Sequence, residues 1–192
     1  MMYITVSLAF FPMMVSYAQT HEINLFSKDT LRPDNGFYVS DRDFVCGHLL
    51  FAFADREPRY KWRQLSIAGR AKLITPDTTI QANEFLFWGY RFNKTDYRFY
   101  NSETYQVLDR DGLIIYQQRY SGGDDGEVLI YYFSLSAHAP IHQLTRKNLL
   151  GAFSNHEKMV QSLRLVKRPV NWLKLIPPNN RPLIMELYLL NQ

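Results

Sequence analysis

The sequence predicts an α+β fold, in which a mainly antiparallel, twisted sheet of about five to seven strands is followed by helices that lie mostly C-terminal. Three observations support this prediction. Short segments rich in aromatic and β-branched residues fill the middle of the 192-residue chain. Turn residues separate most of these segments, and strands joined by such short links pair antiparallel. Helical spacing of apolar residues begins only after residue 135.

The first 18 residues are uncharged and mostly apolar, and they end in Ser16-Tyr17-Ala18, with small residues where a signal peptidase reads them. We therefore expect residues 1–18 to be a signal peptide and the mature protein to be exported, to the periplasm or the cell surface. No Lys or Arg precedes the apolar run, which a start codon further upstream would explain. The alternative is a membrane anchor, but Pro12 interrupts a segment shorter than the roughly 20 residues that a spanning helix needs.

Residues 19–35 are polar and end in turn-forming residues, which predicts a flexible N-terminal arm. Residues 36–192 are expected to form a single α+β domain that includes a C-terminal helical tail. Their number suits one domain, and the 46% apolar content of the chain is enough to build one core.

The domain is expected to open with a short strand at residues 37–39. Ser40 and Asp43 predict a capped helix that ends near Gly47. Asp111-Gly112 is the strongest hairpin signal, and residues 93–96 suit a second hairpin. The strands expected in the middle of the chain are 62–67, 71–75, 84–92, 97–100, 104–108, 113–120 and 127–135. Further helices are expected at 145–153 capped by Thr145, at 156–165 capped by Ser154 or Asn155, and at 183–190 capped by Asn180.

Charge and cysteine content argue against several classes of protein. The 22 Lys and Arg residues exceed the 18 Asp and Glu residues by four, and the basic residues are not clustered, so no nucleic-acid partner is predicted. Cys46 is the only cysteine, which excludes an intramolecular disulfide. Because Cys46 follows Phe44 and Val45, we expect a buried, inert thiol.

Aromatic residues are unusually dense between residues 85 and 133. Alternation along strands sends them to two faces of the sheet, one of which must be core. The other face could be a tyrosine-rich surface for a sugar or a protein partner. The candidate ligand-binding residues are Trp88, Tyr90, Tyr97 and Tyr131.

No metal, cofactor or catalytic site is predicted. The acidic turn at residues 121–126 carries two carboxylates, too few for the six or more oxygens that calcium needs. His138 and His142 are four residues apart, but Pro140 argues against the helix that would align them on one face. His48, Asp124 and His156 are distant in sequence, so a hydrolase would need the fold to bring such residues together.

The segment Gly36-Phe37-Tyr38-Val39-Ser40-Asp41-Arg42-Asp43-Phe44 resembles the opening of the mature domain in a group of uncharacterised exported bacterial proteins. Those proteins also tend to have segments like Phe87-Trp88-Gly89-Tyr90-Arg91, a later Tyr-Tyr-Phe-Ser strand and a following helix. The resemblance covers about residues 36–165 and implies a fold and a compartment, but no activity. We therefore expect a non-catalytic binding or interaction domain of the bacterial envelope, with a glycan-binding module or a hydrolase with an unrecognised site as alternatives.

Overall fold

The computed structural model describes residues 33–53, 61–65, 70–110, 112–121, 126–166, 172–176 and 181–191. The signal peptide predicted at residues 1–18 and most of the arm predicted at 19–35 lie outside these residues. Asn35 is 1% exposed and begins the first strand, one residue before the predicted start of the domain. Its side-chain amide donates to the carbonyl oxygen of Phe53 at 3.4 Å and accepts from the amide N–H of Asn93 at 3.0 Å.

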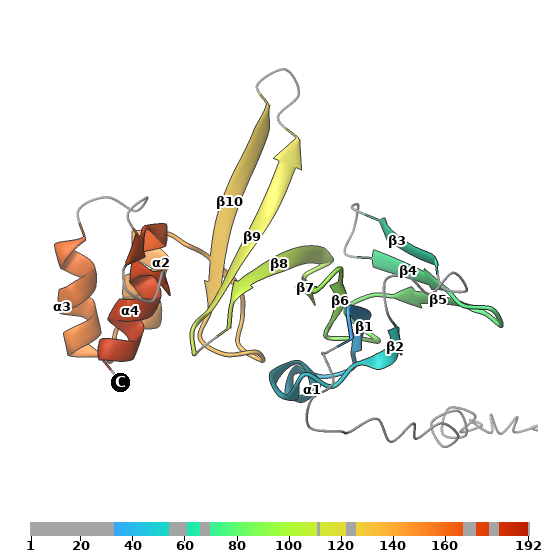
Figure 1. Cartoon of the computed structure of the whole chain (residues 1–192). Coiled ribbons are helices and arrows are strands. Elements are labelled where there is room, and N and C mark those ends of the chain that lie inside the picture. Colours follow the sequence, from blue (N-terminus) through green and yellow to red (C-terminus); the bar gives the residue numbers. More distant parts are fainter. Residues whose placement is uncertain are drawn as a thin grey trace, which may run out of the picture. The chain divides into compact units, whose positions relative to one another are not determined.

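The fold is α+β, as predicted, and its main element is an antiparallel sheet of eight strands (Figure 1). In spatial order these strands are β11 (His142–Gln143), β10 (Glu127–Ser134), β9 (Ile114–Ser121), β8 (Glu103–Asp109), β7 (Thr95–Tyr100), β6 (Gly89–Phe92), β1 (Asn35–Tyr38) and β2 (Leu50–Phe53). The two predicted hairpins join β6 to β7 and β8 to β9. Asn93 and Lys94 both have positive φ, of 47° and 65°, as a type I′ hairpin turn requires.

Smaller elements complete the described chain. A three-stranded sheet contains β3 (Lys61–Leu65), β4 (Arg70–Ile74) and β5 (Thr79–Ala82), and a two-stranded sheet contains β12 (Leu175–Ile176) and β13 (Arg181–Pro182). The helices are α1 (Asp41–Cys46), α2 (Arg146–Ala152), α3 (Glu157–Leu165) and α4 (Leu183–Leu190). Within the described residues, none of these helices is long and apolar enough to cross a lipid bilayer.

The predicted count of five to seven strands was too low for the main sheet. β1 lies between β2 and β6. It joins the sheet by pairing with residues more than fifty positions along the chain, such as Phe37 with Tyr90. β2 pairs with β1 alone and β11 is only two residues long, so neither carries a strong alternating pattern. Long-range pairing of this kind leaves little local signal in the sequence.

The strand predicted at residues 84–92 is shorter than expected. Asn83 stops it, because its side-chain oxygen accepts from the amide N–H of Phe85 at 3.1 Å. Its carbonyl oxygen accepts from Leu86 and Phe87 at 3.2 and 2.9 Å. An asparagine that bonds its own chain two residues on forms a turn, so β6 begins only at Gly89.

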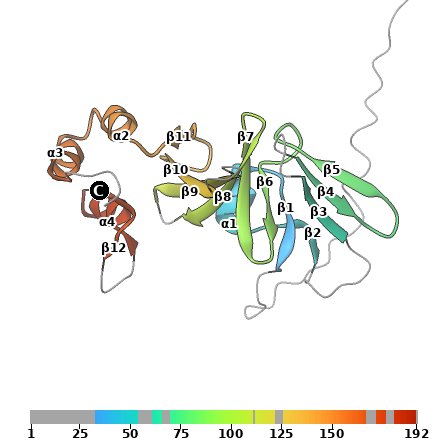
Figure 2. The ribbon, with the colours of Figure 1, turned by 90° about the horizontal axis from the view of Figure 1, so that it is seen from above.

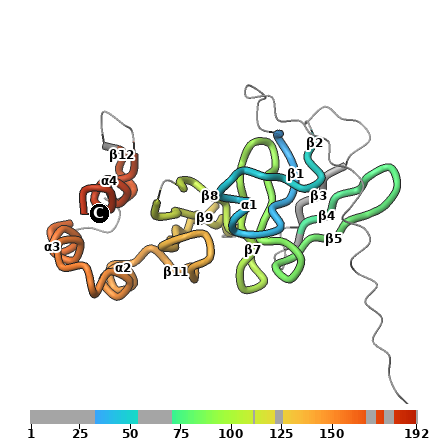
Figure 3. The backbone as a smooth tube through the Cα atoms, turned by 90° about the horizontal axis from the view of Figure 1, so that it is seen from below, coloured from blue at the N-terminus to red at the C-terminus, as the bar shows by residue number. Residues whose placement is uncertain are grey.

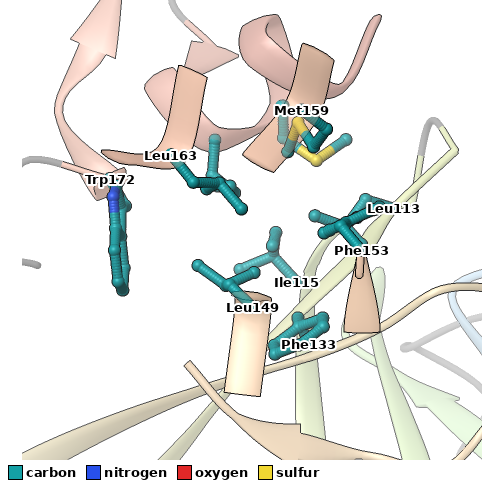
Figure 4. Close-up of a cluster of buried hydrophobic side chains, with 10 residues drawn as sticks. Leu113, Ile115, Phe133, Leu149, Phe153, Met159, Leu163 and Trp172 are labelled. Atoms are coloured by element: carbon teal, nitrogen blue, oxygen red, sulfur yellow. The ribbon is translucent and has the colours of Figure 1, made fainter. Parts of the chain in front are cut away.

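Two buried clusters cover opposite ends of one face of the main sheet. At the β9–β10 end, Ile115 and Phe133 pack against α2, α3 and α4 in a cluster that includes Leu149, Phe153 and Trp172 (Figure 4). At the β1–β7 end, Phe37, Tyr90 and Phe99 pack against Leu73 and Ala82 of the three-stranded sheet. Figure 2 shows α2–α4 and β3–β5 beside different strands of the sheet. We call this face the first face.

The second face is covered by α1 and by the loop that follows β10. Tyr38 and Phe44 pack there with Tyr105, Ile114, Tyr116 and Ala137, and α1 lies over the strands when the sheet is seen from below (Figure 3). The predicted Ser40–Asp43 capping box is present at the start of α1. The prediction for Cys46 was wrong: Phe44 is the only buried residue of this short helix, so the Cys46 thiol is exposed.

The C-terminal helices lie where the sequence placed them; the predicted Thr145 cap is present, Ser154 and Asn155 do not cap α3, and Asn180, predicted to cap α4, lies outside the described residues. The Thr145 hydroxyl accepts from the amide N–H of Asn148 at 3.2 Å and caps α2. His156 and Pro182 occupy the N-cap positions of α3 and α4, and neither side chain makes a capping hydrogen bond. Burial of Met159 and Leu163 in α3 and of Ile184 and Met185 in α4 instead holds these helices against α2 and the sheet.

Candidate binding site

Three of the four predicted ligand-binding residues lie in one row across the first face. Directly paired residues of neighbouring strands share a face of a sheet. The pairs Tyr90–Tyr97, Tyr97–Gln106, Gln106–Gln117 and Gln117–Tyr131 therefore form a continuous row across β6, β7, β8, β9 and β10. We call Tyr97, Gln106, Gln117 and Tyr131 the tyrosine–glutamine row.

Tyr90 belongs to the core and holds Tyr97 in place. Tyr90 is fully buried in the cluster beneath the three-stranded sheet. Its ring stacks on that of Tyr97 with centroids 4.8 Å apart and planes 11° from parallel. Tyr90 and Gln106 lie opposite Tyr97 on the two neighbouring strands, and Tyr90 covers one face of the Tyr97 ring.

The middle of the row is a pair of amides. Gln117 Nε2 donates to Gln106 Oε1 at 2.8 Å, which links β8 to β9 through their side chains. A primary amide has two donor hydrogens and an acceptor oxygen, so this single bond leaves donors on both residues and the acceptor of Gln117. All four residues of the row are partly exposed. The row therefore offers aromatic surface at both ends and hydrogen-bonding groups between them.

Charge near the row is balanced. Arg119 lies opposite Leu129 on the same face, two residues along β9 from Gln117. Its guanidinium pairs with Glu127 at 3.2 Å, and both side chains are more than half exposed. Burial raises the pKa of the Tyr97 hydroxyl, and the positive charge of Arg119 opposes that rise. Tyr97 is thus a neutral hydrogen-bonding phenol at physiological pH.

The row lies between the two clusters that cover the first face. On one side, Ile115 precedes Gln117 by two positions along β9 and Phe133 follows Tyr131 by two positions along β10, and both are buried beneath α2–α4. Tyr90, on the other side, is buried beneath the three-stranded sheet. The amide pair belongs to neither cluster. Gln106 and Gln117 are half-buried, so this part of the first face is polar.

Trp88, the fourth predicted residue, lies on the second face and has a packing role. Its ring stacks on Phe44 with centroids 4.2 Å apart, and its indole N–H donates to the carbonyl oxygen of Ala137 at 2.8 Å. Trp88 precedes Gly89, where the approach of β7 leaves no room for a side chain. The structure therefore separates Trp88 from the tyrosine–glutamine row.

Arg98 organises this second face as a buried cation. It is 4% exposed, and its guanidinium lies over the rings of Trp88, Tyr100 and Tyr116 at 5.3, 5.2 and 6.0 Å from their centroids. It donates to Tyr116 Oη at 3.0 Å and to the carbonyl oxygen of Ala139 at 3.0 Å. No carboxylate among the described residues pairs with it. Hydroxyl, carbonyl and aromatic groups stabilise the charge and tie the loop after β10 to the sheet.

The nearest approach to a hydrolytic triad is a surface cluster of Ser136, His138 and Asp41. Ser136 Oγ lies 3.2 Å from Nδ1 and 3.5 Å from Nε2 of His138, and Asp41 Oδ2 lies 3.8 Å from Nδ1, so the serine is nearest to the nitrogen that the carboxylate also approaches. In a triad the carboxylate and the nucleophile bond different ring nitrogens, so that one orients the histidine and the other gives up its proton. The His138 side chain is also 80% exposed, so the cluster lacks the desolvated setting of an activated serine.

The remaining candidate catalytic and metal-binding residues do not lie together in the described part of the chain. A pocket of about 110 Å³ is lined by His156, Tyr188 and Asn191 together with Leu135, Phe153 and Met159, and it contains no carboxylate. No group of three or more His, Cys, Asp or Glu residues that could hold a metal is found among the described residues. Asp124, in the acidic turn, lies outside them.

Gln106 and Gln117 are the members of the row that the sequence prediction missed. The candidate residues were chosen for aromatic density, and a glutamine on the inward side of a strand does not add to that density. The available clue was the alternation of β9, where Ile115 and Gln117 share one face while Tyr116 faces the other. Strand register was needed to place Gln117 opposite both Gln106 and Tyr131.

Comparison of the chain with protein-family models, with curated proteins and with solved structures found no match.

Proposed function

We propose that this protein is an exported, non-catalytic binding domain of the bacterial envelope, and that it binds its ligand through the tyrosine–glutamine row. The observation that carries the proposal is the pairing of Tyr97, Gln106, Gln117 and Tyr131 across four neighbouring strands. Tyrosine is enriched in binding surfaces because it adds a large contact area at a small cost in side-chain entropy. Strands hold such groups more rigidly than loops do.

The absence of a converging proton donor and acceptor in the described chain favours binding over catalysis. The row contains no carboxylate or histidine, and the Tyr97 phenol, whose pKa burial raises above its ordinary value, is protonated at neutral pH. The compartment in the proposal follows from the apolar segment at residues 1–18.

Co-sedimentation with isolated envelope fragments tests this function. Wild-type residues 19–192 should sediment with the fragments, and the double variant Tyr97→Ala/Tyr131→Ala should bind at least about tenfold more weakly, because it lacks both aromatic contacts. Tyr120→Ala is the matched control, since Tyr120 is 41% exposed, pairs with Val128 and lies on the second face of the same hairpin.

Because Tyr97 also packs on Tyr90, each variant should first be compared with the wild type by thermal unfolding. Gln117→Ala supplies a milder change, since it removes one amide and leaves both rings. If a folded double variant binds envelope as well as the wild type and Tyr120→Ala do, the proposed binding surface is wrong.

A further inference from the structure

We infer that the ligand of the tyrosine–glutamine row is a neutral, linear oligosaccharide that lies across the strands from β7 to β10. The inference rests on the proposed function and adds the chemical class of the ligand and its minimum length. Three properties of the row support it: the distance between its tyrosines, the hydrogen-bonding groups between them and the balanced charge around them.

The separation of the two tyrosines sets a length. Neighbouring strands lie about 4.8 Å apart, so three steps from β7 to β10 place Tyr97 and Tyr131 about 14 Å apart. This distance is close to the length of about three linked pyranose rings. Because Tyr90 covers one face of the Tyr97 ring from β6, the opposite face of the ring is on the side of β8. A ligand must therefore span the amide pair to contact both aromatic side chains.

The amide pair matches the chemistry of sugar hydroxyls. Each hydroxyl both donates and accepts, and the Gln106–Gln117 pair keeps unused donors and an acceptor of its own. An apolar ligand would cover these amides without satisfying them, and each amide group would lose the hydrogen bonds that it makes to water. A peptide strand is recognised through its backbone at a sheet edge, whereas β7, β8 and β9 are interior strands. Sugar rings offer C–H faces for the tyrosines and hydroxyls for the amides.

The charges near the row favour an uncharged ligand. The four residues of the row are neutral, and the guanidinium of Arg119 is already paired with Glu127. A phosphate or carboxylate placed over the amides would have to compete with Glu127 for that guanidinium. A neutral oligosaccharide meets no unpaired charge on this part of the first face.

Isothermal titration of the mature protein with defined oligosaccharides tests the inference. The probes are neutral oligomers of one to six units from the cellulose, chitin and α-glucan series. In one of these series we expect the affinity to rise at least about tenfold between one and three or four units and then to level off, because only the longer oligomers reach both tyrosines. Tyr131→Ala should remove most of this gain, and Tyr120→Ala should keep it.

Two outcomes would overturn the inference, and comparison with envelope binding separates them from failure of the proposed function. One is that no oligomer of the three series binds, and the other is that affinity is independent of length. If either occurs while envelope binding still depends on Tyr97 and Tyr131, the sugar is wrong and the binding surface stands. If the row variants also bind envelope normally, both proposals fail.

Discussion

Gly89 is the residue on which the geometry of the row depends most directly. An ideal Cβ at Gly89 would lie 2.1 Å from the carbonyl oxygen of Tyr97 and 3.1 Å from Cα of Arg98, both of which belong to the backbone of β7. Backbone atoms in a paired strand cannot rotate away as a side chain can. Gly89→Ala must therefore push β6 and β7 apart by about 1 Å to reach ordinary contact distances.

Such a displacement weakens two interactions at once. It stretches the hydrogen bond of 2.9 Å from the Phe99 amide N–H to the carbonyl oxygen of Trp88, worth about 1 kcal/mol. It also disturbs the stacked Tyr90–Tyr97 pair. Overpacking itself costs about 1–3 kcal/mol, so we expect Gly89→Ala to lower the free energy of unfolding by about 3 kcal/mol.

Urea unfolding of a protein of residues 19–192 measures this loss. With an m-value of about 2 kcal/mol/M, the midpoint should fall by about 1.5 M. Gly151→Ala is the matched control, because Gly151 lies inside α2 and an added Cβ there meets no atom within 4 Å. That change should stabilise the protein by about 0.5–1 kcal/mol. A midpoint for Gly89→Ala within about 0.3 M of the wild type would refute the steric argument.

Two further predictions concern the second face. Arg98→Lys should lower the free energy of unfolding by about 2 kcal/mol, because an ammonium cannot reproduce the planar fork that reaches Tyr116 and Ala139 together. Arg119→Lys is the control, since the Arg119 side chain is 60% exposed, and it should stay within about 0.5 kcal/mol of the wild type in the same urea assay. Burial raises the pKa of Tyr105 to about 12, whereas the unfolded chain loses this proton near pH 10. The contribution of the neutral phenol to stability is therefore fully present below pH 10 and is lost as the pH rises towards 12. Urea titrations at pH 9, 10 and 11 should show this fall in the free energy of unfolding, and Tyr105→Phe should reduce it.

Local signals in the sequence predicted the elements that local interactions determine. Ser40 and Asp43 satisfy each other across the first turn of α1, and Thr145 caps α2 through its own neighbours. The hairpins at Asn93-Lys94 and near Gly112 likewise depend on a few adjacent residues. β1 and β2 depend instead on partners far along the chain, so periodicity could not place them in the sheet.

The candidate residues were predicted less well than the fold, because aromatic character does not reveal which face a side chain occupies. Trp88 and Tyr90 are two residues apart and would share a face of a regular strand. β6 begins only at Gly89, however, and Trp88 packs with Phe44 while Tyr90 packs with Phe37 on the opposite face. Exposure also differs, since Tyr90 is fully buried and Tyr131 is partly exposed.

Under the proposed function, the two faces of the sheet have different roles, one in stability and one in binding. On the second face, Arg98 and Trp88 hydrogen-bond to the loop after β10, and Arg98 also bonds Tyr116 of β9. On the first face, separate clusters anchor the two ends, so the amide pair in the middle is not needed to complete either core. A change of Gln106 or Gln117 should therefore cost little stability. Gly89 and Tyr90, by contrast, keep Tyr97 in position.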